Sequence, residues 1–113
     1  MHFMLLIYGD EIAWDEASPE AQSAEYRRHS QFGSTVVELG GSIVSAAPLA
    51  PTATATSIRG DLITDGPFVD TKEALGGYYI VEATDLDHVI KMAKHCPAYS
   101  GGIEIRPLVD MSA

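Results

Sequence analysis

FMLLIY, residues 3–8, is the stretch that decides the fold. Its length matches that of a β-strand, in which side chains alternate between two faces. The two sets are Phe3, Leu5 and Ile7 on one face, and Met4, Leu6 and Tyr8 on the other. Both sets are apolar, so we expect a strand whose two faces are both covered.

A polar loop, GDEIAWDEA at residues 9–17, and then a long helix are predicted after this strand. Ser18 is a good N-cap, and Pro19 suits the first helical position. The helix is expected to run to about Leu39, because the Gly40-Gly41 pair is typical of a helix end. A helical projection places five residues in one sector: Glu25, His29, Phe32, Val36 and Leu39. His29 therefore lies on the apolar face of the helix.

The rest of the chain predicts more strands and a second helix. Strands are expected over residues 42–47, 54–59, 62–64, 76–83 and 102–108. Gly60-Asp61 joins the second and third of these as a tight hairpin. Thr84-Asp85-Leu86-Asp87 has the form of a capping box, so the second helix begins there and ends near His95-Cys96, before a proline.

The order of these elements is βαβ, a hairpin insertion and βαβ again. This order is the split βαβ plan of an α+β, ferredoxin-like fold, with both helices on one face of the sheet. A length of 113 residues fits a single domain, residues 1–113. The other face of the sheet is also apolar and should be buried against another surface. A second copy of the same chain is the simplest partner for it. We therefore expect a two-fold homodimer.

Charge and composition narrow the classes of function. Sixteen acidic and 7 basic residues give a net charge of −9, which repels nucleic-acid phosphates and anionic membrane surfaces. We expect no direct nucleic-acid binding and no membrane span, since no apolar run reaches about 20 residues. Cys96 is the only cysteine and no signal peptide is expected, so a cytoplasmic location is predicted. No nucleotide-binding or paired-cysteine motif predicts a cofactor.

His29 and Asp10 are the candidate catalytic residues. An imidazole on the sheet-facing side of a helix is partly desolvated and titrates near neutrality. Asp10 directly follows the first strand and could orient or polarise that ring. An alternative stays open, in which His29 is a histidine at the edge of the core, bonded to a backbone carbonyl.

Two other reactive patterns favour structural roles. His88 and His95 stand close to aspartates but lack metal-ligand spacing, so a solvated helix face explains them and no metal site is predicted. Cys96, at the apolar end of a helix, is typical of a small core residue rather than of a nucleophile.

The polar connection TDGPFVDTKEALGGYY, residues 64–79, either only joins strands or also holds a ligand. Asp65 suits a turn, since its side chain accepts from amides two residues on, and Lys72 suits a plain surface position. The density of polar groups around Phe68 also fits a loop that lines a ligand cleft. The candidate ligand-binding residues are Tyr8, Trp14, Asp65, Phe68, Lys72 and Tyr78, with Tyr8 and Trp14 as walls for an aromatic ring.

Several stretches together resemble one known family nearly from end to end. They are MLLIYGDE at 4–11, PTATATSIR at 51–59, TDGPFVDTKEALGGYYIVEA at 64–83, CPA at 96–98 and IEIRPL at 103–108. This set is similar to the DGPF (DGPFAETKE) branch of the YCII-related proteins. Val69 and Asp70 stand where that signature has Ala and Glu.

The resemblance implies a ferredoxin-like subunit and a dimer of the α+β barrel type. Relatives are frequently encoded beside extracytoplasmic-function sigma factors, and the wider family includes a dehydrochlorinase that uses a His-Asp pair on a chlorinated hydroquinone. His29 precedes Gly40 by eleven residues, as the family's histidine precedes its helix-ending glycine, and Asp10 matches the acid after the first strand. The chain departs from the family at Cys96-Pro97, where the wider family has Asp-Pro.

Two hypotheses of function follow. In the first, the dimer is a small-molecule enzyme of lyase type, with His29 as general acid/base and Asp10 as its partner. In the second, it is a non-catalytic binding or regulatory dimer that senses a metabolite or contacts an extracytoplasmic-function sigma factor through its acidic surface.

Overall fold

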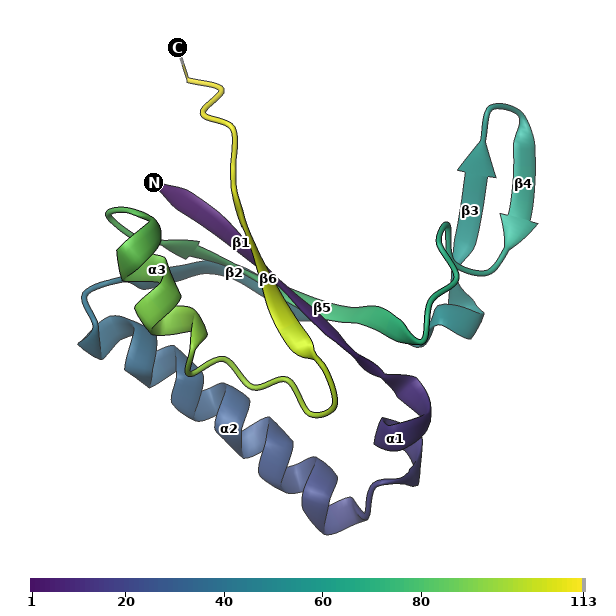
Figure 1. Ribbon diagram of the computed structural model, residues 1–113, viewed down its shortest axis with the longest axis horizontal. Helices are drawn as coiled ribbons and strands as arrows, with labels where there is room; N and C mark the ends of the chain where they lie inside the picture. Colours follow the sequence, from purple (N-terminus) through teal and green to yellow (C-terminus); the bar gives the residue numbers. More distant parts are fainter. Residues whose placement is uncertain (113) are drawn as a thin grey trace.

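A computed structural model describes residues 1–112 and contains a four-stranded antiparallel sheet, order β2-β5-β1-β6, and a separate β3-β4 hairpin (Figure 1). The strands are β1 (His2–Asp10), β2 (Ser42–Pro48), β3 (Thr56–Arg59), β4 (Leu62–Asp65), β5 (Glu73–Glu82) and β6 (Gly102–Pro107). The helices are α1 (Glu11–Glu16), α2 (Pro19–Glu38) and α3 (Leu86–Ala93), and a 3-10 turn, η1, spans Thr52–Thr54.

The topology confirms the ferredoxin-like prediction. Strand β5 lies between β1 and β2 and is antiparallel to both, and β6 pairs with the other edge of β1. Helices α2 and α3 lie on the same side of the sheet (Figure 1). The expected hairpin insertion is also present, turning at Gly60 and Asp61, and the positive φ of Gly60 (60°) is the conformation that a tight turn needs.

The core fills the space between the sheet and the two long helices. Its fully buried side chains are Phe3, Leu5 and Val81 from the sheet, Phe32 and Val36 from α2, and Val89 and Met92 from α3. Phe32 packs its ring edge-on against Tyr79 of β5, with ring centroids 4.9 Å apart. The opposite face of the sheet carries Met4, Leu6, Tyr78 and Ile80, which are partly exposed. Both faces of the sheet are therefore apolar as predicted, and the cover of the second face stays a prediction.

Several element boundaries differ from the sequence-based expectation. The strand expected over residues 54–59 begins only at Thr56, because Thr52–Thr54 form η1. Residues 11–16 form helix α1 rather than a loop, because the Asp10 carboxylate caps it by accepting from the amides of Ile12 (3.0 Å) and Ala13 (3.4 Å). Strand β5 begins at Glu73 rather than Gly76, since β1 is long enough to pair with it. The N-cap of α3 is Asp85 rather than Thr84, and its carboxylate accepts from the His88 amide at 2.8 Å.

Helix α3 also ends earlier than expected, at Ala93, and the chain then turns through His95 and Cys96. Leu39, expected in the buried sector of the first long helix, is 36% exposed, because it is already the C-cap of α2. Within residues 1–112, no helix is both long enough and apolar enough to span a bilayer.

Cys96 is a core residue, in agreement with the structural interpretation of its sequence position. Burial raises the pKa of its thiol to about 12, and the negative charge of Glu25 adds to the rise. At pH 8 we expect iodoacetamide to alkylate Cys96 at least about a hundredfold more slowly in the native protein than in guanidinium chloride, because the thiolate is the reacting form. Mass spectrometry of timed samples measures both rates, and equal rates would contradict the buried position.

Candidate functional site

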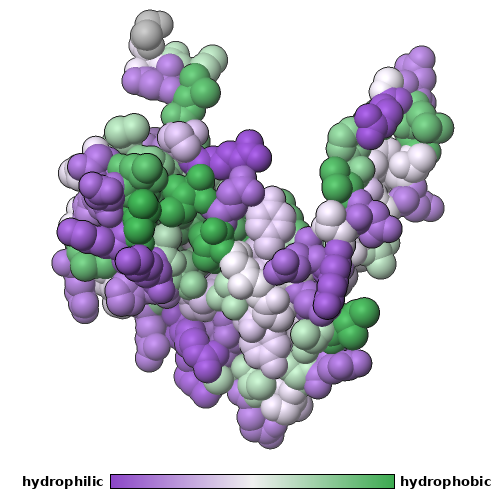
Figure 2. Space-filling model, viewed as in Figure 1, coloured by the Kyte–Doolittle hydropathy of each residue, from purple (hydrophilic) through white to green (hydrophobic). Residues whose placement is uncertain are grey.

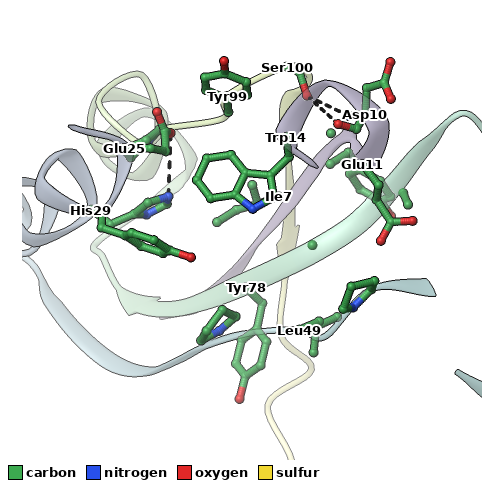
Figure 3. A pocket seen from close by; sticks show the side chains of 18 of the residues that line it. Ile7, Asp10, Glu11, Trp14, Glu25, His29, Leu49, Tyr78, Tyr99 and Ser100 are labelled. Atoms are coloured by element: carbon green, nitrogen blue, oxygen red, sulfur yellow. Dashed lines mark hydrogen bonds and ion pairs between the residues drawn. The ribbon is translucent and has the colours of Figure 1, made fainter. Parts of the chain in front are cut away.

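A pocket of about 580 Å³ opens at the end of the sheet, between α2, α1 and the loop before β6 (Figure 3). Its floor is the segment of β5 where the register with β1 shifts, so that Gly76 is an extra, bulged residue. The missing side chain there leaves space above the strand, and the Gly76 carbonyl is held by the Leu49 amide at 2.9 Å. The sequence pattern GG within a strand is the local cause of the hollow.

Several aromatic residues contribute to the pocket wall. Trp14 of α1 lies edge-on to Tyr26 of α2 and to Tyr99, with centroid distances of 5.7 and 5.3 Å. Tyr79 adds to this aromatic lining, and Tyr8 and Tyr78 border the pocket, although the Tyr78 side chain points to the opposite face of the sheet (Figure 3). Such a wall suits a flat apolar or aromatic molecule.

Four carboxylates give the pocket its charge. They belong to Asp10, Glu11, Asp15 and Glu25. No lysine or arginine belongs to the lining among the residues that the structure describes. The site should therefore repel anions and accept neutral molecules or cations.

His29 projects from the middle of α2 into this pocket, and its side chain is 28% exposed. Its Nδ1 atom lies 2.8 Å from the Tyr79 hydroxyl, and its ring stacks against that of Tyr79. Its Nε2 atom lies 3.9 Å from Oε1 of Glu25, four residues earlier on the same helix face. The partners of His29 are thus side chains, and no backbone carbonyl of residues 1–112 bonds to its ring.

The environment of this cluster shifts two pKa values. Burial lowers the pKa of His29 below 6.5, and the negative charge of Glu25 opposes this only in part. Burial raises the pKa of Tyr79 to about 12, and the neighbouring Cys96 adds to the rise. Near pH 7 the site therefore holds a neutral imidazole bonded to a protonated phenol, a pair that can both accept and donate a proton.

The low pKa of His29 has a consequence for stability. An unfolded histidine binds a proton more readily than this one, so the free energy of unfolding falls as the pH drops through 6.5. We expect His29→Gln to remove this part of the pH dependence. Urea denaturation at pH 7.5 and 5.5 measures it, and an NMR titration midpoint of His29 at or above 6.5 would contradict the account.

The structure brings together five of the eight residues singled out from the sequence. His29, Asp10, Tyr8, Trp14 and Tyr78 all line the pocket. The Asp10 carboxylate is used as the cap of α1 and does not bond to His29. The Asp10 backbone amide donates to the Ser100 hydroxyl at 2.8 Å. Asp10 thereby fixes the helix that carries Trp14.

The remaining three residues lie outside the pocket lining. Asp65 is the last residue of β4, Phe68 is 58% exposed with the Arg59 guanidinium 4.2 Å from its ring centroid, and Lys72 is exposed. The DGP turn closes the base of the hairpin, where the Gly66 carbonyl accepts from the Ser57 hydroxyl at 2.7 Å. In this subunit the connection at residues 64–72 therefore serves the hairpin and not the pocket.

Sequence reasoning missed Glu25 and Tyr79 as site residues. Glu25 is only 6% exposed, and one of its oxygens bonds to Arg28 at 2.7 Å. The sequence did contain a signal for Glu25. Glutamate is rarely buried, so a glutamate in the apolar sector of a helix, four residues before a histidine, is unusual.

His88 joins the start of α3 to the end of α2 by hydrogen bonds, instead of only facing solvent. Its Nδ1 accepts from the Thr84 amide at 3.0 Å, and its Nε2 donates to the carbonyl of Leu39 at 2.6 Å, which satisfies the end of α2. Within residues 1–112, no group of three or more His, Cys, Asp or Glu side chains is arranged to hold a metal ion.

Comparison with known proteins places the chain in a family. The family model for the YCII-related domain matches residues 1–112. An uncharacterized protein of Rhizobium meliloti (strain 1021) is 31% identical over 115 residues, which cover 96% of this chain and 92% of that protein. The chain therefore belongs to the YCII-related domain family.

Proposed function

We propose that the pocket binds a small organic molecule and that His29 acts on it as a general acid/base. The reaction type that such a site suits is lyase-like, the removal of a proton or a halide from an aromatic or enol-like compound. The observation that carries the proposal is the position of the His29 ring, part-buried and bonded to Tyr79, inside an aromatic pocket of about 580 Å³. Family membership supports the fold but does not by itself define a reaction.

Asp10 acts on this site through the backbone. Its carboxylate caps α1, and α1 supplies Trp14 to the pocket wall, where its ring packs edge-on against Tyr26. Removing the cap should loosen the Trp14 wall at a cost of about 1 kcal/mol, rather than change the protonation of His29. In this proposal Asp10 is a positioning residue.

The binding part of the proposal is tested with Trp14, the only tryptophan of the chain. We expect its fluorescence to change saturably on titration with ring ketones such as cyclohexanone. Ala46 is an exposed pocket residue of β2, paired with Tyr79, so Ala46→Phe should fill the space and abolish the response. An unchanged response in that variant would place the binding elsewhere.

The catalytic part is tested by deuterium exchange. In deuterated buffer, the wild-type protein should accelerate exchange of the α-hydrogens of cyclohexanone, as followed by NMR. His29→Gln should lose most of the acceleration, on the order of a hundredfold, while the Trp14 response shows that the probe still binds. Equal acceleration by both proteins would contradict a role of His29 as acid/base.

We also propose that the subunit works as a homodimer of α+β barrel type, paired through the face of the sheet opposite the helices. This face carries two apolar cross-strand pairs at its centre, Met4 with Ile80 and Leu6 with Tyr78. Charged residues surround this centre: Glu104 and Arg106 of the edge strand β6 pair with each other at 2.5 Å, and Glu82 at the end of β5 lies 3.7 Å from His2. An apolar centre with a polar rim is the pattern of a stable protein interface.

A second candidate function is supported by the β3-β4 hairpin. It stands clear of the rest of the subunit and displays apolar residues (Figure 2). Three of them are more than half exposed, Ile58, Leu62 and Ile63, and so are Phe68 and Val69 in the connection that follows. A lone two-stranded hairpin is marginally stable, so a protein partner that covers it would be favoured.

We propose this surface as the contact for a non-catalytic, regulatory role of the dimer, including binding of an extracytoplasmic-function sigma factor. The buried Cys96 thiol supports the cytoplasmic location that such a role requires. Pull-down at low salt with a sigma factor encoded beside this protein tests the role. The matched variant Ile63→Asp, on the proposed contact surface, should bind more weakly than the wild-type protein. A pull-down that is negative for the wild-type protein would count against this role and leave the pocket proposal standing.

A further inference from the structure

Glu25 holds a buried carboxylate oxygen that has no hydrogen-bond partner in the part of the chain that the structure describes. Its Oε2 atom accepts from Arg28 at 2.7 Å, whereas Oε1 is fully buried and makes no hydrogen bond. Glu25 belongs to the pocket lining, and its Oε1 atom lies on the side of His29, 3.9 Å from Nε2 (Figure 3). A buried carboxylate oxygen without a donor is costly, so its presence at a pocket wall indicates that a ligand supplies the donor.

The neighbouring groups determine which atom of His29 carries the proton. The Tyr79 hydroxyl lies 2.8 Å from Nδ1 and Glu25 lies on the side of Nε2. A carboxylate favours a hydrogen, rather than a lone pair, on the nitrogen that faces it. We therefore assign the hydrogen to Nε2, with the Tyr79 hydroxyl donating to Nδ1.

This assignment places a donor beside an acceptor. The separation of 3.9 Å between Nε2 and Oε1 is too long for a direct hydrogen bond. An oxygen atom that lies about 2.8 Å from each of them bridges the gap with normal geometry. Such an oxygen must accept one hydrogen and donate another.

We infer that Glu25 and His29 form a subsite for a hydroxyl group, and that the ligand of the pocket is a neutral organic molecule that carries one. The inference rests on the proposed function, because it names the chemical group that this pocket recognises. A hydroxyl accepts from His29 Nε2 and donates to Glu25 Oε1. An ether cannot donate, and an ammonium cannot accept, so each satisfies only one of the two atoms.

The charge of the pocket excludes the acidic alternatives. A carboxylate or phosphate ligand would meet Asp10, Glu11, Asp15 and Glu25, and the described lining has no cationic side chain to pair with it. The guanidinium of Arg28 is already bonded to Glu25. The bound hydroxyl thus stays neutral: it donates a hydrogen bond to Oε1 of Glu25 and accepts one from the Nε2–H of His29.

Four probes with the same ring test the subsite: benzyl alcohol, benzyl methyl ether, benzylammonium and benzoate. Dissociation constants come from NMR titration of the wild-type protein and of Ala46→Phe, which marks binding in the pocket. We expect benzyl alcohol to bind at least about tenfold more tightly than the ether, and benzoate to bind most weakly.

Glu25→Gln is the matched variant. Arg28 can bond only to the amide oxygen, which leaves the amide NH₂ facing His29 and removes the acceptor. The preference for the alcohol over the ether should therefore disappear, while the ether binds as in the wild type and so reports an intact pocket. Leu86→Gln, an exposed change on α3, should keep the preference.

The outcomes separate this inference from the proposed function. If the alcohol and the ether bind the wild-type pocket equally, the hydroxyl subsite is refuted and the pocket stands. If benzylammonium binds most tightly, Glu25 is instead a cation site and the inference is again refuted. If none of the four probes binds, both the subsite and the small-molecule pocket are refuted.

Discussion

Replacing Gly101 by alanine is expected to lower the free energy of unfolding by about 3 kcal/mol. Gly101 precedes β6, where the chain passes against the end of β1. A Cβ atom at this position would overlap the Tyr8 carbonyl and lie 2.9 Å from the Cα of Gly9. Both neighbours are backbone, so β1 and β6 would have to separate where their pairing starts. For a domain with a total stability of 5–15 kcal/mol this is a severe change, and urea denaturation measures it.

Gly102 is the matched control for this substitution. It is the next residue in the chain, and a Cβ atom built on it meets nothing within 4 Å. Gly102→Ala should therefore change the stability by less than about 1 kcal/mol. Similar losses for the two variants would mean that the close passage of Gly101 over Tyr8 does not exist. Because Tyr8 lines the pocket, any folded Gly101→Ala protein should also bind cyclohexanone more weakly.

Ile80→Asp is expected to convert the proposed dimer to a monomer. Ile80 lies at the centre of the sheet face opposite the helices, paired with Met4 of β1. An aspartate there would bury an unpaired charge from each subunit, which costs about 3 kcal/mol or more and raises the dissociation constant on the order of a hundredfold. Sedimentation equilibrium measures the change directly. The monomer should keep its fold, because Ile80 points away from the core residues Tyr79 and Val81.

Val37→Asp serves as the control for the dimer experiment. Val37 is 66% exposed on α2, on the opposite side of the sheet, so an equal change of charge there should leave the dimer intact. A wild-type chain that is monomeric at all concentrations would overturn the proposed pairing. Dissociation by both variants would show that added charge, rather than the position of Ile80, is responsible.

The fold could be predicted from the sequence because its signals are local. The two apolar sets of residues 3–8, the Ser18-Pro19 helix start and the hairpin turn at Gly60 each specify one element by a short pattern. The order of the elements then leaves few topologies. Helix α1 was not predicted, because only six helical residues follow its cap, Asp10, and they contain no apolar repeat. The first residue of β5 was not predicted correctly, because it is determined by how far the partner strand β1 extends.

The site could be predicted only in part, because its geometry is set by tertiary contacts. His29 was found from its place on the apolar face of a helix, and it does reach the pocket. The role of Asp10 depends on whether its carboxylate turns toward the following amides or toward the pocket, and no sequence pattern defines that choice. The contact between Tyr79 and His29 joins residues that are 50 positions apart, and only the packing of α2 on the sheet creates it.

The most direct test of the account is a crystal structure of the wild-type protein with benzyl alcohol. The account predicts the ring of the probe against Trp14, with its hydroxyl oxygen within hydrogen-bond distance of both His29 Nε2 and Glu25 Oε1. A probe bound only outside this pocket, or one whose hydroxyl points to solvent while Glu25 Oε1 stays without a partner, would contradict it.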